Sequence, residues 1–230
     1  MDSWHADGRK GKGILYATYF FQKQIMITAP VLAISRHRLT TDGEGVTTLV
    51  AFHGCPLSCR YCINNQCLEP DATVMSLTAE ELIEELMIDN LYFVATGGGV
   101  TFGGGEPLLR YEFIRAFCEQ CPEEWNINIE TSLNVPLHYL QSIVSFVGKF
   151  YIDIKDMNAD IYERYTGKRS QQVIDNLKWL ATQPEMQDRV VVRLPQIPGY
   201  NSEDDIENSK RQLAAMNFHH FDCFKYITKK

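Results

Sequence analysis

Short apolar runs alternate with amphipathic segments along most of this 230-residue chain, and this alternation constrains the fold more than any other feature. The apolar runs predict six strands, at Val46–Phe52, Gly99–Gly103, Asn126–Glu130, Phe150–Ile154, Arg189–Leu194 and Cys223–Thr228. Helices are expected at Leu108–Cys121, Leu137–Val147, Val173–Ala181 and Asp204–Ala215, and after the capping-box sequence that begins at Thr78. Six such units cannot close an eight-stranded barrel. The sequence therefore predicts an α/β fold, a partial (β/α)6 TIM-like barrel with mostly parallel strands.

Composition narrows the class of protein without identifying it. With 45% hydrophobic and 22% charged residues, the chain can bury one good core. A net charge of −7 disfavours a general affinity for nucleic acid or anionic membranes, so we expect neither as a partner. Seven cysteines, an odd number, argue against a secreted disulfide framework and favour a reducing, cytoplasmic location.

The first part of the chain holds an apolar stretch, Gly13–Ile34, that follows a short basic segment. Three polar residues, Gln22 to Gln24, interrupt it, so no run of the ~18 apolar residues needed to span a membrane remains. We expect residues 1–34 to be an N-terminal extension that packs, as a strand or a helix, on a single core domain formed by residues 35–230.

The segment Cys55-Pro-Leu-Ser-Cys59-Arg-Tyr-Cys62 places three thiolate donors at Cx3Cx2C spacing in one short loop after the first predicted strand. Three thiolates can hold an iron–sulfur cluster and leave one iron without a cysteine ligand, where chemistry can occur. Four cysteines instead make closed clusters or structural zinc sites, and Cys67 lies five residues after Cys62. The residues alone allow either interpretation.

A glycine-rich segment about forty residues later runs from Gly97-Gly98-Gly99-Val100-Thr101 to Gly104-Gly105-Glu106-Pro107. Glycines without a Cβ let the backbone approach a ligand closely, and Glu106 supplies a nearby acceptor. Alone, the segment equally suits a plain turn between a strand and a helix. Because the carboxyl ends of parallel strands share one rim, we expect it to meet the cysteine loop and Glu130-Thr131 there.

Together, the cysteine motif and the Gly-Gly-Glu-Pro segment resemble the radical S-adenosylmethionine (SAM) superfamily. The preceding Gly-Gly-Gly-Val-Thr is similar, more narrowly, to activating enzymes of glycyl-radical enzymes, of the pyruvate formate-lyase activating enzyme type. Further matches to this group are Asp42-Gly43-Glu44-Gly45, Asp153-Ile154-Lys155-Asp156-Met157-Asn158, and Arg193 with Pro198-Gly199-Tyr200. Glutamate at 44 and glycine at 103 replace the group's proline and serine, and its C-terminal histidine motif has no convincing match.

The resemblance implies a [4Fe-4S] cluster on Cys55, Cys59 and Cys62 that cleaves SAM reductively to a 5′-deoxyadenosyl radical. No catalytic residue beyond cluster and SAM is implied. The implied SAM-binding residues are Tyr61, Gly104, Gly105, Glu106, Asp153, Lys155 and Arg193, and the implied monovalent cation site is Glu130, Thr131 and Asp153. The implied partners are a glycyl-radical enzyme, whose backbone glycine loses a hydrogen atom, and a flavodoxin- or ferredoxin-type electron donor.

Several of these residues also have ordinary structural interpretations. Tyr61 suits loop packing, and Asp153 with Lys155 suits a solvated ion pair on one strand face. Cys118 and Cys121 lie late in a predicted helix and are expected to be buried thiols. Two other functions therefore stay open, namely radical SAM chemistry on a small molecule or peptide, and a noncatalytic iron–sulfur or zinc protein.

Overall fold

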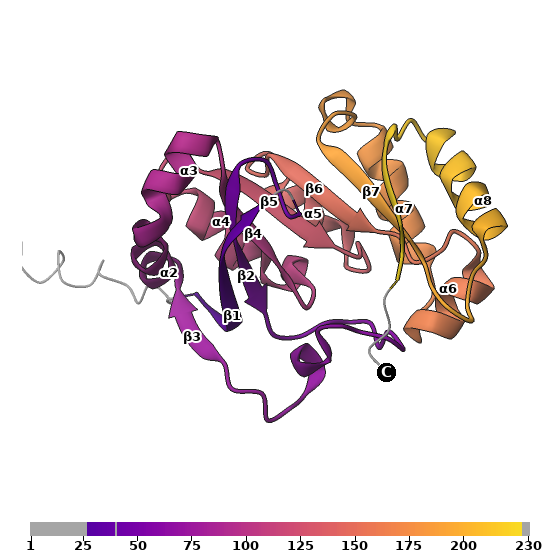
Figure 1. Cartoon of the computed structure of the whole chain (residues 1–230), viewed down its shortest axis with the longest axis horizontal. Helices are drawn as coiled ribbons and strands as arrows, with labels where there is room; N and C mark the ends of the chain where they lie inside the picture. Colours follow the sequence, from indigo (N-terminus) through magenta and orange to yellow (C-terminus); the bar gives the residue numbers. More distant parts are fainter. Residues whose placement is uncertain (1–26, 40, 227–230) are drawn as a thin grey trace, which may run out of the picture.

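The computed structural model describes residues 27–39 and 41–226, which form one eight-stranded sheet flanked by helices (Figure 1). The strand order is β3-β1-β2-β4-β5-β6-β7-β8. The strands are β1 (Thr28–Leu39), β2 (Val46–Phe52), β3 (Met75–Thr78), β4 (Gly99–Gly104), β5 (Asn126–Thr131), β6 (Lys149–Asp153), β7 (Val190–Gln196) and β8 (His220–Lys225). From β2 to β8 every neighbouring pair is parallel, which confirms the predicted partial barrel.

The seven α-helices that the structure describes lie mostly between these parallel strands in the chain. They are α2 (Ala79–Leu86), α3 (Asn90–Thr96), α4 (Tyr111–Cys118), α5 (Leu137–Ile143), α6 (Ala159–Thr166), α7 (Gln171–Ala181) and α8 (Glu203–Ala214). The capping box at Thr78 is confirmed, since its hydroxyl accepts from the Glu81 amide and the Glu81 carboxylate accepts from the Thr78 amide. Within the described ranges, none of the helices has the length and apolar content needed to cross a membrane.

Strand β3 and the helices α3 and α6 were not predicted, and β1 begins in the segment that was expected to form a strand or a helix. β1 pairs antiparallel with β2 and with β3, and so extends the sheet by two strands beyond the parallel set. Residues 28–34 of the expected N-terminal extension form the first part of β1, while residues 1–26 lie outside the described residues. The division of the chain at residue 34 stays a prediction.

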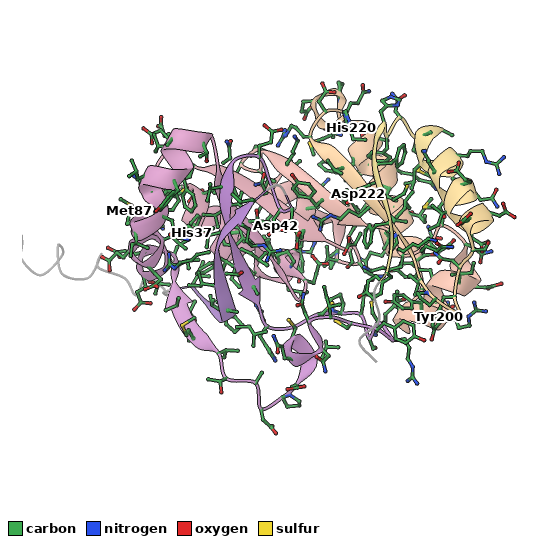
Figure 2. All side chains as sticks on the ribbon, viewed as in Figure 1. His37, Asp42, Met87, Tyr200, His220 and Asp222 are labelled. Atoms are coloured by element: carbon green, nitrogen blue, oxygen red, sulfur yellow. The ribbon has the colours of Figure 1, made fainter. Side chains whose placement is uncertain are left out.

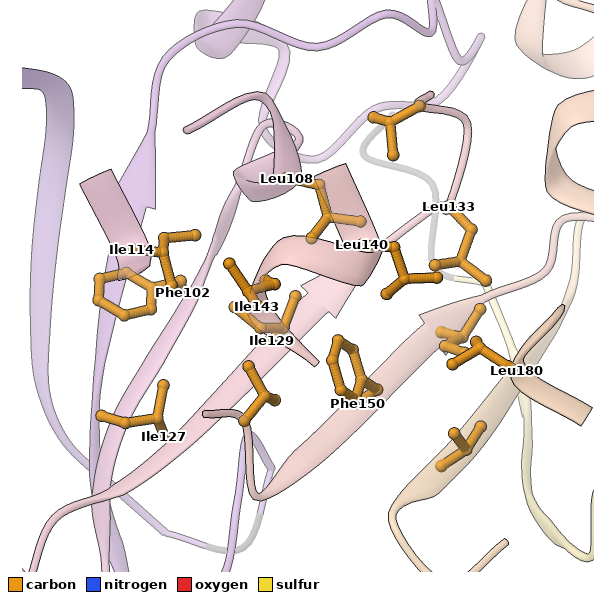
Figure 3. Packing of buried hydrophobic residues seen from close by; sticks show 14 of the residues in the cluster. Phe102, Leu108, Ile114, Ile127, Ile129, Leu133, Leu140, Ile143, Phe150 and Leu180 are labelled. Atoms are coloured by element: carbon orange, nitrogen blue, oxygen red, sulfur yellow. The ribbon is translucent and has the colours of Figure 1, made fainter. Parts of the chain in front are cut away.

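The main core lies between the sheet and the helices that follow its strands. Alternate strand residues such as Phe102, Ile129 and Phe150 point to this side and contact apolar residues of the covering helices, including Ile114 and Leu140 (Figure 3). Full burial of each such side chain stabilises the fold by roughly 1.5–3 kcal/mol. The alternate residues on the opposite, concave face are polar in β5 and β6, and they are therefore free to build a site.

A short loop between β1 and β2 reaches across the concave face and holds the strands together. The buried Asp42 pairs with Arg38, and its carbonyl accepts a 2.6 Å hydrogen bond from the Thr101 hydroxyl of β4. Glu44 forms an ion pair with Lys149 at the start of β6. The side chain of Asp42 lies among the central strands in Figure 2. This loop thus links three strands that are distant in the sequence.

Candidate active site

The cysteine loop follows β2 and runs along the lower edge of the molecule toward α6 (Figure 1). Backbone hydrogen bonds fix its course: the Ser58 amide donates to the Thr166 carbonyl at 2.9 Å, and the Arg60 amide donates to the Tyr165 carbonyl at 3.1 Å. At its base, the Gly54 amide donates to the Cys67 carbonyl at 2.9 Å. The loop is therefore held at both ends by parts of the chain that do not depend on a bound metal.

The thiols of Cys55, Cys59 and Cys62 are free, partly exposed and close enough to influence one another. The pKa of Cys55 is raised to about 12, mainly by burial, with smaller contributions from Glu106, Cys59 and Cys62 and an opposing hydrogen bond from the Leu57 backbone. Burial also raises the pKa of Cys59 to about 11, although Lys155 opposes the shift. Because thiolates bind metals, these thiols need a cationic centre to ionise at neutral pH.

The donor set fits a cluster better than a single ion. Among the described residues, no three His, Cys, Asp or Glu side chains are arranged around one point to hold a single metal ion. In a cubane, each thiolate binds a different iron, so the sulfurs stand farther apart. Cys67 is buried, and of the three loop cysteines only Cys62 contributes to its raised pKa. Cys67 therefore lies beside one loop thiol rather than among all three.

The end of β4 is joined directly to the base of this loop. The Gly105 amide donates to the Phe52 carbonyl at 2.9 Å, and the Glu106 amide donates to the Gly54 carbonyl at 2.8 Å. A Cβ on Gly105 would lie 2.2 Å from the Gly54 carbonyl oxygen, so only glycine allows this approach. The side-chain amide of Asn64 donates to the Gly104 carbonyl at 3.1 Å, and the sequence did not predict a role for this residue.

The Glu106 side chain is buried and turned toward the end of β5. Its carboxylate accepts from the Thr131 hydroxyl at 2.6 Å and from the Ser132 hydroxyl and amide at 2.6 and 2.9 Å. The Leu108 amide donates to it at 3.2 Å. Burial raises the pKa of Glu106 despite these donors. The carboxylate thus ties the rim of β4 to β5, while the backbone of Gly105 and Glu106 contacts the base of the cysteine loop.

Asp153 and Lys155 lie at the end of β6 and form an ion pair of 3.1 Å. Ile152 and Ile154 are buried on the opposite face, as the predicted alternation requires. Burial alone would lower the pKa of Lys155, but Asp153 and Cys59 outweigh it and raise that pKa. The structure therefore brings this ion pair to the cysteine loop, since Lys155 and Asp153 both act on the pKa of Cys59.

Arg193 on β7 stands beside Asp153 in the sheet register. Its guanidinium donates to Glu130 at 2.7 Å and to the Thr41 carbonyl at 2.6 Å, and it lies over the Tyr151 ring at 4.8 Å. The guanidinium thus joins three strands of the concave face to the loop after β1. The role of Thr41 gave no signal in the sequence, because it depends on a carbonyl oxygen rather than on a side chain.

The residues expected to bind a monovalent cation do not fit such an ion. The Thr131 hydroxyl faces the Glu106 carboxylate, on the other side of β5 from the Glu130 side chain. Glu130 is already neutralised by Arg193, and Asp153 by Lys155. The three side chains are not brought together around one point, and we derive no step through a bound monovalent ion.

Tyr61 packs within an aromatic cluster beside the loop. Its ring centroid lies 6.3 Å from that of Tyr165 and 5.9 Å from that of Tyr200, and its carbonyl accepts from the Tyr226 hydroxyl at 2.6 Å. Figure 2 shows Tyr200 at the lower right, on the side where the loop ends. These contacts support the packing interpretation, and a role in adenine binding stays a prediction.

Two further features lie outside this rim. Cys118 and Cys121, at the end of α4, are free and partly buried, and burial raises the pKa of Cys118 to about 12.

A cavity of about 320 Å³ lies between the last two strands and α8. Its lining contains none of the predicted site residues: it consists of Leu194, Gln196, Glu203, Ile206, Glu207, Cys223, Phe224 and Lys225.

Comparison with known proteins gives consistent matches. Residues 49–212 match the radical SAM superfamily. The chain is 33% identical to the (2S)-3-sulfopropanediol dehydratase activating enzyme of Klebsiella oxytoca over 73% of this chain and 70% of that protein. It is 38% identical to the pyruvate formate-lyase-activating enzyme of Clostridium pasteurianum over 60% of this chain and 57% of that protein.

A solved structure supports the fold alone. The crystal structure of Streptococcus suis SuiB bound to S-adenosylmethionine superimposes with a TM-score of 0.59 at 16% sequence identity. The match covers 76% of this chain and 39% of SuiB. At this identity, the likeness shows a shared strand and helix arrangement and does not transfer a substrate.

Proposed function

The chain belongs to the radical SAM superfamily, and we propose that it is the activating enzyme of a glycyl-radical enzyme. The match to two activating enzymes carries this proposal, because both relatives are named for activation of an enzyme rather than for a small-molecule product. The Gly97–Thr101 sequence, which leads into the strand that meets the cysteine loop, supports it. The chain spans only 57–70% of these relatives, so the whole activity is stated as a proposal.

The superfamily uses a [4Fe-4S] cluster and SAM, and the three loop cysteines suit the cluster. With both groups bound, the reduced cluster would supply one electron to the SAM sulfonium, and cleavage of a carbon–sulfur bond of SAM would give methionine and a 5′-deoxyadenosyl radical. Cys55, Cys59 and Cys62 would hold three irons as thiolates. In this proposal, the backbone of Gly104 and Gly105, next to the loop, binds the amino group of SAM.

Charged residues of β6 and β7 complete the proposed site. Lys155 lies near Cys59 and is paired with Asp153, so together they offer a cation and a carboxylate at the rim of the sheet. Arg193, held by Glu130, is proposed to orient the SAM carboxylate, and Tyr61 to shape the adenine pocket. These residues position SAM and exclude water, and none has to move a proton during the cleavage.

The proposed partners follow from this chemistry. The substrate is a backbone glycine of a glycyl-radical enzyme, and the electron donor is a flavodoxin- or ferredoxin-type protein. A reducing, cytoplasmic compartment suits seven cysteines that are free in the described part of the chain.

Anaerobic reconstitution tests the proposal. The purified protein is loaded with iron and sulfide, reduced with dithionite and given SAM, and 5′-deoxyadenosine is measured. It is then mixed with candidate glycyl-radical enzymes and followed by electron paramagnetic resonance. We expect SAM cleavage and a glycine-centred doublet. Cleavage with no doublet from any candidate would favour a small-molecule or peptide substrate instead, and absence of both cleavage and a SAM-dependent spectral change would indicate a noncatalytic metal protein.

A further inference from the structure

Four exposed cations gather on the outer side of the cysteine loop of this acidic chain. We call Arg60, Arg164, Lys168 and Arg169 the Arg60 patch. None of the four forms a salt bridge with a described residue. The chain as a whole carries a net charge of −7, so a local cluster of unpaired positive charge stands out against the rest of the molecule.

Backbone contacts bring these four residues together although they come from two segments. The Arg60 amide bonds to the Tyr165 carbonyl, next to Arg164, and the Ser58 amide bonds to the Thr166 carbonyl. Gly167, which precedes Lys168, lies against the Ser58 hydroxyl, since a Cβ there would be 3.3 Å from that oxygen. The end of α6 and the turn after it therefore run alongside the cysteine loop and bring Arg164, Lys168 and Arg169 into the same region as Arg60.

The patch lies beside one of the proposed cluster ligands. Arg60 directly follows Cys59, and the packed rings of Tyr61, Tyr165 and Tyr200 form its base. Arg164 lies 5.5 Å from the Tyr200 ring centroid and donates to the Tyr200 carbonyl at 3.0 Å, which fixes its direction. Asp160 and Glu163 are exposed acids on the same helix, and the four cations of the patch outnumber them.

We propose that the Arg60 patch docks an acidic one-electron carrier protein. This inference rests on the proposed function, because it assumes a cluster on Cys55, Cys59 and Cys62. One electron passes from the reduced carrier to the oxidised [4Fe-4S]2+ cluster and gives [4Fe-4S]+; the carrier is oxidised by one electron and no proton moves. Complementary charge accelerates such encounters by about 10- to 1000-fold at low salt, and a carrier with acidic residues around its redox centre is the chemistry that fits.

A charge-reversal triple variant, Arg60→Glu with Lys168→Glu and Arg169→Glu, tests the proposal. The matched control, Arg115→Glu with Lys178→Glu and Arg211→Glu, changes the net charge equally on exposed helical positions away from the loop. The probe is flavodoxin, and its dissociation constant is measured with cluster-loaded and cluster-free protein at about 50 and about 300 mM salt. We expect the patch variant to bind at least about tenfold more weakly and to lose most of the salt dependence, and the control to bind like wild type.

Activity with two reductants separates docking from catalysis. SAM cleavage driven by limiting reduced flavodoxin should fall at least about tenfold in the patch variant, while dithionite-driven cleavage should be unchanged. Unaltered flavodoxin binding would overturn the proposal, as would an equal loss with both reductants. Loss of dithionite-driven glycyl-radical formation with intact SAM cleavage would instead assign the patch to the activation partner. If the wild type cleaves no SAM with dithionite, the proposed function is wrong. The dissociation constants of flavodoxin with the wild type and the variants still test the docking surface in that case.

Discussion

Cys59 is the loop thiol that lies close to Cys62 and to both charged residues at the end of β6, Asp153 and Lys155. Cys62 and Asp153 raise its pKa beyond the effect of burial, and Lys155 lowers it. Its neighbours on both sides are hydrogen-bonded to the end of α6, so its position is fixed by the backbone. A thiolate here would hold one iron next to the charged side chains of Asp153 and Lys155 at the end of β6.

We predict that Cys59→Ala loses the cluster and all SAM cleavage, because two thiolates cannot retain a cubane with an open iron. Iron content, the visible absorption spectrum and 5′-deoxyadenosine formation measure the effect. Cys118→Ala removes a thiol of similar burial at the end of α4 and should keep all three signals. Retained cleavage in Cys59→Ala would refute the ligand assignment.

Glu106 offers a prediction about pH. Burial raises its pKa above the ordinary 4.5, so the folded state keeps the proton to higher pH than the unfolded state does. The stabilisation from this group is therefore complete below 4.5 and is lost as the pH rises through the raised pKa. Gln does not titrate, so Glu106→Gln lacks this pH dependence. We therefore expect the difference in unfolding free energy, wild type minus Glu106→Gln, to decrease as the pH rises from 4.5 through the raised pKa. The decrease should be up to about 1.4 kcal/mol per pH unit. Urea denaturation of the cluster-free proteins measures it, and a difference that grows with pH would contradict the assignment.

At the scale of elements, the contact between the end of β4 and the base of the cysteine loop fixes the site. Two backbone hydrogen bonds join Gly105 and Glu106 to Phe52 and Gly54, and the close approach depends on the missing Cβ of Gly105. The position of both motifs after predicted parallel strands predicted that these segments share a rim. It could not predict that the Glu106 carboxylate is used to bind β5, because Ser132 carries no motif of its own.

Gly105→Ala should separate the two elements. Its Cβ would stand 2.2 Å from the Gly54 carbonyl oxygen, and relief of that clash moves the strand end by about 1 Å, a misplacement that lowers catalytic rates about 100-fold. We expect a loss of this size in SAM cleavage, measured as 5′-deoxyadenosine per cluster. Gly148→Ala, where the nearest atom is 3.4 Å away, is the matched control and should remain close to wild type.

The elements that the sequence did not predict show what hydrophobic patterns cannot detect. β1 contains residues that the apolar stretch up to Ile34 assigned to an extension, and only pairing with β2 and β3 makes it part of the sheet. α6 has few apolar residues and depends on the Asn158 side chain, which caps it by accepting from the Asp160 and Ile161 amides. Strand addition at an edge and capping by a loop residue are tertiary and local effects that hydrophobic periodicity does not report.

At the scale of the whole molecule, the parallel order of six strands explains why distant motifs meet. The strands β2, β4, β5, β6 and β7 are consecutive neighbours, so residues at their carboxyl ends face one rim as the sequence predicted. The ion pairs across the concave face were not predictable, because Glu130 and Arg193 are 63 residues apart and their contact depends on strand register. The alternation of side chains along β5 also turns Glu130 and Thr131 to opposite sides of the strand, which residue order alone does not show.

The same arrangement predicts how SAM binding should couple to folding. A ligand that binds only the folded, cluster-loaded protein at 100 times its dissociation constant stabilises it by about 2.7 kcal/mol. We therefore expect SAM to raise the unfolding temperature of the anaerobic, oxidised, cluster-loaded protein and to leave Cys59→Ala unchanged. 5′-Methylthioadenosine lacks the amine and carboxylate that would chelate an open iron, and it should give a much smaller shift. Equal stabilisation of both proteins by SAM would mean that its binding does not require the cluster, and that no iron coordination site is open to it.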